Sequence, residues 1–323
     1  MIGLTAGVAL LFVASLLVGP AKISPLVSLS ALIWGDSGPL TLVMREIRLP
    51  RALLGIMVGA SLGLCGAAMQ GYLRNPLAEP GLIGVSGSAA LGAVIAIQTG
   101  LTAAFALALP LAALAGAAVS VVLLFALAGP RGGSLTLILA GIAISALAGA
   151  FTALVLSLSP NPFAATEIVF WMMGSLADRS FLHVTLALPF ILLGLALLLP
   201  LARGLDTLTL GEDAAAALGT HLLRLRLTLI SGVAVMVGTA TAVAGAVGFV
   251  GLVVPHLLRS AVGARPGKLL AASALGGAAM VLAADIAVRL ILPGRDLKLG
   301  VLTAIVGAPL FLHLVYRTRR DGG

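Results

Sequence analysis

Long apolar stretches separated by short polar segments run along the whole chain. About ten of them are apolar enough to predict membrane helices, at residues 2–19, 51–73, 86–99, 104–128, 134–157, 181–200, 227–246, 250–261, 268–291 and 299–316. Most approach the roughly 20 residues that a helix needs to cross a hydrocarbon core of about 30 Å. The pattern predicts an all-α, polytopic membrane protein.

Two of the predicted helices, 86–99 and 250–261, are conspicuously short. The second follows a glycine-rich segment from Gly245 to Gly251. Irregular backbone at membrane depth is tolerated where it is buried in protein or lines a cavity, so short, interrupted spans often border one. We expect these two segments to lie beside a cavity.

Composition agrees with a membrane protein. Hydrophobic residues make up 60% of the 323 residues and charged residues only 9%, against about 45–50% and 25% in ordinary globular domains. The longest hydrophilic segments are 20–50, 159–180 and 201–226, so we expect a single transmembrane domain over residues 1–323. No nucleotide-binding GxxxxGK[ST] motif occurs. ATP hydrolysis or ligand capture would therefore require another chain.

The net charge of +8 is better explained by membrane topology than by nucleic-acid binding. Basic residues are scattered and aromatic residues make up only 4%, so no nucleic-acid-binding surface is indicated. An even number of spans places both termini on one side, together with Arg74, the loops at Arg131, 203–226 and 259–268, and the tail 317–320. That side holds 11 of the 19 basic residues. The positive-inside rule then places both termini in the cytoplasm.

Small residues recur every fourth position in two predicted spans. One set is Gly55, Gly59 and Gly63, and the other is Gly141, Ser145 and Gly149. Small residues at this spacing let helix backbones approach closely. Static packing and a moving interface both fit the pattern, and static packing is the simpler reading.

The cytoplasmic segment 205–226, LDTLTLGEDAAAALGTHLLRLR, predicts two short helices. Gly211 breaks the chain, Glu212 and Asp213 suit a helix start, and an alanine run ends at Gly219, which suits a C-cap. A second short helix is expected over Leu222–Arg226. The result is either a plain amphipathic connector or a compact knob on which a cytoplasmic partner docks.

Glu212, Ala215, Ala216 and Gly219 resemble the coupling loop of ABC-importer permeases. More of the chain resembles one branch, the FecCD-type permeases, which import ferric siderophores, haem and cobalamin. The similar blocks, in the same order, are RLPR (48–51), NPLAEPGLIGVS (75–86), WMMGSL (171–176), LGEDAAAALG (210–219), GFVGLVVPHLLR (248–259), AADIAVR (283–289) and GVLTAIVGAPLF (300–311). The resemblance covers the chain from about Arg48 to Tyr316.

The resemblance implies a type II ABC importer permease in the bacterial inner membrane, a homodimer of ten-helix subunits working by alternating access. Two cytoplasmic ABC ATPases would dock on the coupling loops, and a periplasmic binding protein would deliver the substrate. The chain itself would be no enzyme and hold no cofactor or metal, since ATP and Mg²⁺ belong to the ATPase. The implied coupling residues are Leu210, Gly211, Glu212, Ala215, Ala216, Leu218 and Gly219. An iron chelate (ferric siderophore or haem) is the favoured substrate, with cobalamin as the alternative.

The resemblance also implies sites at both ends of the second span. Arg48, Arg51 and Arg289 resemble sockets for glutamates of the binding protein, because a guanidinium can hold a carboxylate with two hydrogen bonds. The alternative is that these side chains reach for lipid headgroups. Asp285 lies four residues before Arg289, so an ion pair within one helix is expected.

At the inner end, Asn75 and Leu77 resemble a cytoplasmic gate, and Ser134 falls near a second constriction, with a looser match. Ordinary turn chemistry also explains Asn before Pro. A stand-alone secondary transporter would need ionisable residues in mid-span, and the spans hold almost none. An intramembrane enzyme would need a Ser/His pair, an Asp dyad or an HExxH helix, and none occurs.

Overall fold

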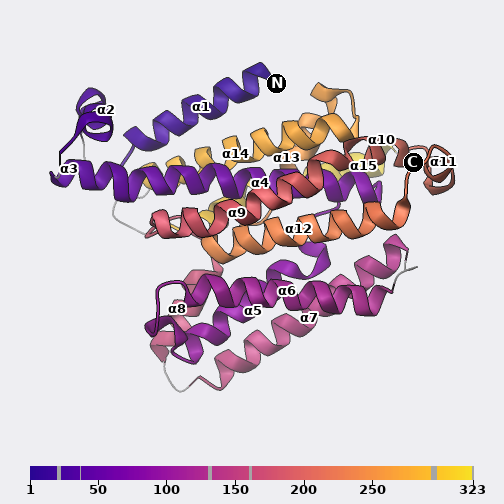
Figure 1. The fold of residues 1–323 in the computed structure, drawn as a ribbon, viewed down its shortest axis with the longest axis horizontal. Coiled ribbons are helices and arrows are strands. Elements are labelled where there is room, and N and C mark those ends of the chain that lie inside the picture. The colour runs from indigo at the N-terminus through magenta and orange to yellow at the C-terminus, as the bar shows by residue number, and fades with distance from the viewer. Residues whose placement is uncertain (20–22, 37, 130–132, 160–161, 292–296, 322–323) are drawn as a thin grey trace.

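The computed structural model describes the chain except residues 20–22, 37, 130–132, 160–161, 292–296 and 322–323. Each of the ten predicted segments is helical in it (Figure 1). They are α1 (Ile2–Leu17), α4 (Leu49–Leu73), α5 (Val85–Gln98), α6 (Ala108–Ala128), α7 (Ser134–Ser157), α9 (Phe181–Leu198), α12 (Leu222–Ala244), α13 (Val250–Arg259), α14 (Pro266–Ile291) and α15 (Leu299–Asp321). The all-α prediction is confirmed.

Six helical stretches among the described residues are long and apolar enough to cross a membrane. They are Pro39–Leu73, Ala108–Ala128, Ser134–Ser157, Phe181–Leu208, Leu222–Ala244 and Pro266–Ile291. Four other predicted spans are shorter apolar helices: Ile2–Leu17, Val85–Gln98, Val250–Val262 and Leu299–His313. The exact number of complete spans therefore stays a prediction.

Segment 20–50 is not a plain hydrophilic connection. It contains α2 (Pro25–Trp34), α3 (Pro39–Leu42) and a π-helical turn, η1 (Val43–Arg48), that continues directly into α4. The polar residues of η1 interrupt the apolar pattern but not the helix, because Arg and Glu have high helix propensity. Segment 159–180 likewise contains α8 (Pro162–Met172).

The helices form two groups that meet at α12. Helices α4, α9, α13 and α14 lie on one side of α12, with α1 across α14 and α4, and α5, α6, α7 and α8 lie on the other (Figure 1). Helix α12 packs against α4 and α9 in the first group and against α5 and α6 in the second. It is accordingly one of the most buried spans in the chain.

A long, close contact between helices joins α4 to α14. A Cβ atom at Gly59 would collide with the backbone of Gly277, and one at Gly63 would collide with the backbone of Ser273. A Cβ at Gly277 would in turn meet the backbone of Gly59. The predicted close packing through the first small-residue strip is confirmed.

The second strip behaves differently. Gly141 lies against the backbone of Leu82, in the short 3₁₀-helix η2 (Pro80–Ile83), but nothing in this chain lies within 4 Å of a Cβ placed at Gly149. Gly149 is exposed on α7. Within one chain the strip is therefore closely packed at Gly141 and open at Gly149, because spacing alone does not say which part of a strip has a neighbour.

Replacing Gly59 tests the helix contact. Gly59→Val should lower the free energy of unfolding by about 1–3 kcal/mol, since overpacking forces neighbouring backbones apart. Thermal unfolding of the purified protein in detergent measures the change. Gly149→Val makes the same chemical change in open space on α7 and is the matched control. Equal stability of the two variants would contradict the contact.

Candidate functional site

A buried carboxylate joins α4 to α14 at the end where α1 finishes. Arg51 donates from Nη2 to Oδ1 of Asp285 at 2.8 Å and from Nε at 2.9 Å. Arg289 Nη2 lies 2.8 Å from the other oxygen, Oδ2. Asp285 is only 1% exposed. The predicted pair between Asp285 and Arg289 is confirmed, and Arg51 is a second partner that sequence reasoning missed.

Two of the arginines also hold the end of α1. Arg48 Nη1 donates to the carbonyl oxygens of Leu16 and Leu17 at 2.9 and 3.1 Å. Arg289 donates to the carbonyls of Ser15 and Val18 at 2.8 and 2.7 Å, and to Ser15 Oγ at 2.7 Å. The last carbonyls of a helix lack partners within it and carry partial negative charge, so guanidinium groups stabilise this end.

These contacts decide against lipid-headgroup anchoring for Arg48 and Arg289. Arg48 is 5% exposed, and its guanidinium contacts protein carbonyls rather than the surface. The structure brings the three predicted docking residues into one cluster, in which Arg51 is the most open, with 18% of its side chain exposed, against 8% for Arg289. Docking of a binding protein on this cluster stays a prediction.

Arg179, in the turn before α9, is used in the same way as Arg48. Its Nε donates to the carbonyl of Val243 at 2.6 Å, next to the last residue of α12. Burial lowers the pKa of Arg179, and the nearby charge of Asp178 partly opposes that shift. Guanidinium groups thus cap the C-terminal ends of both α1 and α12.

The predicted coupling loop forms a small helical projection. It consists of α10 (Ala202–Leu208) and α11 (Glu212–Ala217), and α11 stands at the edge of the molecule in Figure 1. Glu212 and Asp213 occupy the first turn of α11. The N–H groups of Gly219 and Thr220 donate to Ala216 and Ala215 at 2.9 Å. The predicted helix start and glycine C-cap are confirmed.

Backbone and side chains explain the shape of this projection. Gly211 and Gly219 have φ angles of +104° and +88°, which favour glycine. Ala215 is buried, whereas Ala216 is exposed and Leu210 and Leu218 are 66% and 62% exposed. The expected second short helix over Leu222–Arg226 was wrong: these residues are the first turns of α12, because no helix-breaking residue separates them from the span.

The base of the projection is tied to α14. Asp206 in α10 accepts a hydrogen bond from the N–H of Gly267 at 2.8 Å, in the first turn of α14. That turn has backbone N–H groups without partners in the helix, so a carboxylate stabilises it. Helix α14 has 26 residues and is about 39 Å long at 1.5 Å per residue. Its far end carries Asp285 and Arg289.

The predicted gate residues lie in a turn after α4. Asn75 Oδ1 accepts a hydrogen bond from the N–H of Leu77 at 2.9 Å, which closes a local turn. Asn75 is exposed and Leu77 half-buried. Ser134 is the first residue of α7 and follows Gly133 as N-cap, and residues 130–132 lie outside the described part of the chain. The turn chemistry is confirmed, and a constriction at these residues stays a prediction.

Three polar side chains near the inner half of α4 were missed by sequence reasoning. Gln70 donates to the carbonyl of Leu252 at 3.2 Å and accepts from Arg259 at 2.7 Å. Tyr72 accepts from Arg226 at 3.0 Å. Glu79 accepts from the N–H of Phe249 at 3.2 Å. A polar residue in or beside a membrane span was the available signal.

The part of the chain that the structure describes has no group of three or more His, Cys, Asp or Glu residues placed to hold a metal ion. Its polar groups instead join helices to one another and shape a projection at one end. An all-helical membrane chain with these features belongs to the class of transporter permeases.

The comparison with known proteins gives the family. The model of the FecCD transport family matches residues 7–317, and the chain belongs to this family. The Fe(3+) dicitrate transport permease FecD of Escherichia coli K12 is 39% identical over 86% of each chain. The vitamin B12 import permease BtuC of Vibrio cholerae is 38% identical over 98% of this chain and 92% of that protein.

A solved structure shows the same fold. It is an inward-facing ABC transporter described as being of the metal-chelate type, with a TM-score of 0.84 and 34% identity, covering 98% of each chain. The predicted family and the predicted permease fold are confirmed.

Removing the shared carboxylate tests the cluster of Arg48, Arg51, Asp285 and Arg289, which we call the outer cluster after its predicted side of the membrane. Asp285→Ala should lower the free energy of unfolding by about 3–5 kcal/mol, because two half-buried guanidinium groups lose their counter-ion. It should also speed protease cleavage after α1, whose anchor Arg289 is then unpaired with a carboxylate. Asp36→Ala removes an exposed carboxylate and is the control. A stability loss no larger than that of the control would show that the cluster does not hold the helices together.

Proposed function

We propose that this chain is the membrane permease subunit of a binding-protein-dependent ABC importer. In this proposal it carries an iron chelate, a ferric siderophore or haem, across the bacterial inner membrane by ATP-driven alternating access. The observation that carries the proposal is the match to the FecCD transport family over residues 7–317. The match of fold to an ABC transporter over 98% of the chain supports it.

The cytoplasmic partner would be a pair of ABC ATPases, one on each subunit of a homodimer. Helix α11 is the element suited to contact them, since it projects from the helix layer and is flanked by the exposed side chains of Leu210 and Leu218. The hydrogen bond from Gly267 to Asp206 would pass a movement of this projection to α14. Helix α15 ends at the same end of the molecule as α11 (Figure 1), which supports a cytoplasmic C-terminus.

The periplasmic partner would be a binding protein docking at the opposite end of α4 and α14. Arg51 offers the most open guanidinium of the outer cluster. Because Arg48, Arg51 and Arg289 also hold α1, α4 and α14 together, reversing all three charges would disrupt the permease itself. A milder change, Arg51→Lys, keeps the charge but loses the fork that also binds Asp285, so thermal stability is measured beside binding-protein association.

The substrate is an iron chelate in this proposal, with cobalamin as the second candidate. One relative is named for Fe(3+) dicitrate and another for vitamin B12, at nearly equal identity. The solved relative is described as being of the metal-chelate type, a description that covers iron chelates and also the cobalt complex cobalamin. Recognition would rest mainly with the binding protein, so the permease sequence alone separates the two weakly.

Reconstitution tests the function directly. The permease, its ATPase and its binding protein are placed in proteoliposomes, and uptake of ⁵⁵Fe-labelled chelates and of cobalamin is followed with and without ATP. We expect iron-chelate uptake that requires ATP. ATP-dependent uptake of cobalamin alone would show that cobalamin is the substrate and would still support an ABC importer. Uptake driven by an ion gradient without ATP would contradict the proposal.

Residues of the projection should couple hydrolysis to uptake. Gly219→Val forces a β-branched residue into a left-handed conformation, at a cost of roughly 1–2 kcal/mol, and should distort the end of α11. We expect fewer substrate molecules taken up per ATP hydrolysed, with binding-protein association unchanged. Gly263→Val places the same strain at another inner turn, where φ is +70° and no atom crowds a Cβ. Equal loss of coupling in both variants would remove the special role of α11.

A further inference from the structure

Two irregular segments meet in the interior of the helix layer. One is the turn 74–84, which follows α4, and the other is the extended segment 245–249, which follows α12. Pro80 of the first segment lies against Gly251 at the start of α13. Glu79 Oε1 accepts the hydrogen bond from the N–H of Phe249 in the second segment at 3.2 Å.

This meeting point is deep in the molecule. Gly251 packs against the backbone of Leu62 and Gly66, in the middle of the 25-residue helix α4. Helix α13 has only 10 residues, or about 15 Å, roughly half of a hydrocarbon core of about 30 Å. Glu79 therefore lies where an unpaired backbone N–H would be costly and a charge needs solvation.

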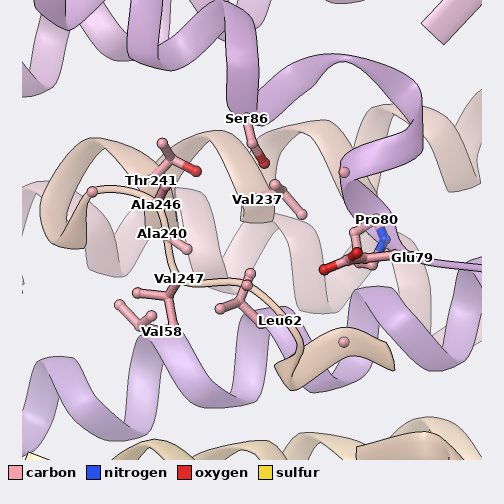
Figure 2. Close-up of a pocket in the computed structure, with 14 residues that line it drawn as sticks. Val58, Leu62, Glu79, Pro80, Ser86, Val237, Ala240, Thr241, Ala246 and Val247 are labelled. Atoms are coloured by element: carbon pink, nitrogen blue, oxygen red, sulfur yellow. The ribbon is translucent and has the colours of Figure 1, made fainter. Parts of the chain in front are cut away.

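A cavity beside this point has room for water. It has a volume of about 160 Å³ and is lined by both irregular segments and by α4, α5 and α12. Figure 2 shows the carboxylate of Glu79 and the hydroxyl groups of Ser86 and Thr241 directed into it. At about 30 Å³ for each water, it has room for roughly five waters. The predicted cavity beside the two short helices is confirmed.

Helix α13 is held by side chains along its length. Phe249 has a φ angle of +66°, so the chain turns sharply just before the helix starts, and Glu79 takes its N–H. Gln70 of α4 binds the carbonyl of Leu252 and accepts from Arg259 at the other end of α13. Gln70 thus fixes α13 to α4, whereas Glu79 fixes the start of α13 to the turn 74–84.

We propose that Glu79 is a positioning residue for transport. Its carboxylate holds the turn 74–84, which contains Asn75 and Leu77, in a fixed position relative to the start of α13. The turn follows α13 when the helices shift, and this is how the inner gate closes in step with ATP hydrolysis. This inference rests on the proposed function and assigns the control of the gate within it.

Three substitutions at Glu79 show whether the length of the side chain or its charge matters for coupling. Glu79→Ala removes the acceptor, Glu79→Gln keeps an oxygen at the same reach without the charge, and Glu79→Asp keeps the charge but is one carbon too short. Uptake per ATP hydrolysed is measured in proteoliposomes that contain the ATPase and the binding protein. We expect about a tenfold loss for Glu79→Ala, a similar loss for Glu79→Asp, and near-normal coupling for Glu79→Gln. Glu167→Ala, at an exposed carboxylate on α8, is the control.

Hydrogen exchange of the peptide around Phe249 gives the second readout. Exchange should rise in Glu79→Ala and Glu79→Asp and stay at the wild-type level in Glu79→Gln and Glu167→Ala. Faster exchange with unchanged uptake per ATP would overturn the proposal, because the bond would then be structural only. Unchanged exchange and unchanged coupling would overturn it as well.

Two further outcomes are also decisive. If Glu79→Ala does not fold, the Glu79→Gln and Glu79→Asp variants can still be compared. Uptake per ATP hydrolysed that is equal or higher in Glu79→Asp than in Glu79→Gln overturns the proposal. If the wild-type protein shows no ATP-driven uptake, the proposed function fails, and the role of Glu79 falls with it. Wild-type uptake with normal coupling in every Glu79 variant leaves the function standing and rejects only the role of Glu79.

Discussion

The backbones of α4 and α14 touch at Gly59, Gly63 and Gly277, and the placement of the polar groups at both ends depends on this contact. Close approach brings Arg51 of α4 within 2.8 Å of Asp285 on α14 at one end. At the other end, Asp206 accepts a hydrogen bond from the first turn of α14 and ties that helix to the projection formed by α10 and α11. Where the glycines leave no side chain between the two helices, backbone atoms make close dispersion contacts, and in a membrane such packing replaces the hydrophobic effect as the force between helices. The two helices therefore form one unit that connects the outer cluster with α11.

Several arginines in the described part of the chain bind carbonyl oxygens at helix ends. Arg48 and Arg289 bind the last carbonyls of α1, and Arg179 binds a carbonyl at the end of α12. A buried guanidinium loses its hydration, and this loss is offset only when its donors find partners. The cluster around Asp285 meets that condition with one shared carboxylate and several carbonyl oxygens. Such a cluster fixes which helices pair, and it leaves Arg51 as the group with most access to a partner protein.

Local features of this chain were predictable from its sequence, and contacts between distant segments were not. The ten helical segments follow from hydropathy, and the start and end of α11 follow from Gly211, Glu212 and Gly219, because these signals act within a few residues. The pairing of Arg51 with Asp285, 234 residues apart in the chain, and the bond of Glu79 with Phe249 depend on how α4, α13 and α14 pack. The same limit applies elsewhere: whether Gly149 has a neighbour, and whether Leu222–Arg226 joins the next span, depends on surroundings that spacing does not describe.

Distances within the α4–α14 unit test its rigidity most directly. Spin labels at Ile47 and Leu290 report the outer ends of the two helices, and labels at Arg74 and Lys268 report the inner ends; all four side chains are exposed. Cys65, which is buried, is replaced by Ala in both label pairs. Pulsed electron–electron double resonance then gives the distance within each label pair in the assembled transporter, with and without bound ATP. A rigid unit predicts narrow distributions that stay in place for both pairs, whereas a shift of either distance with nucleotide would contradict it.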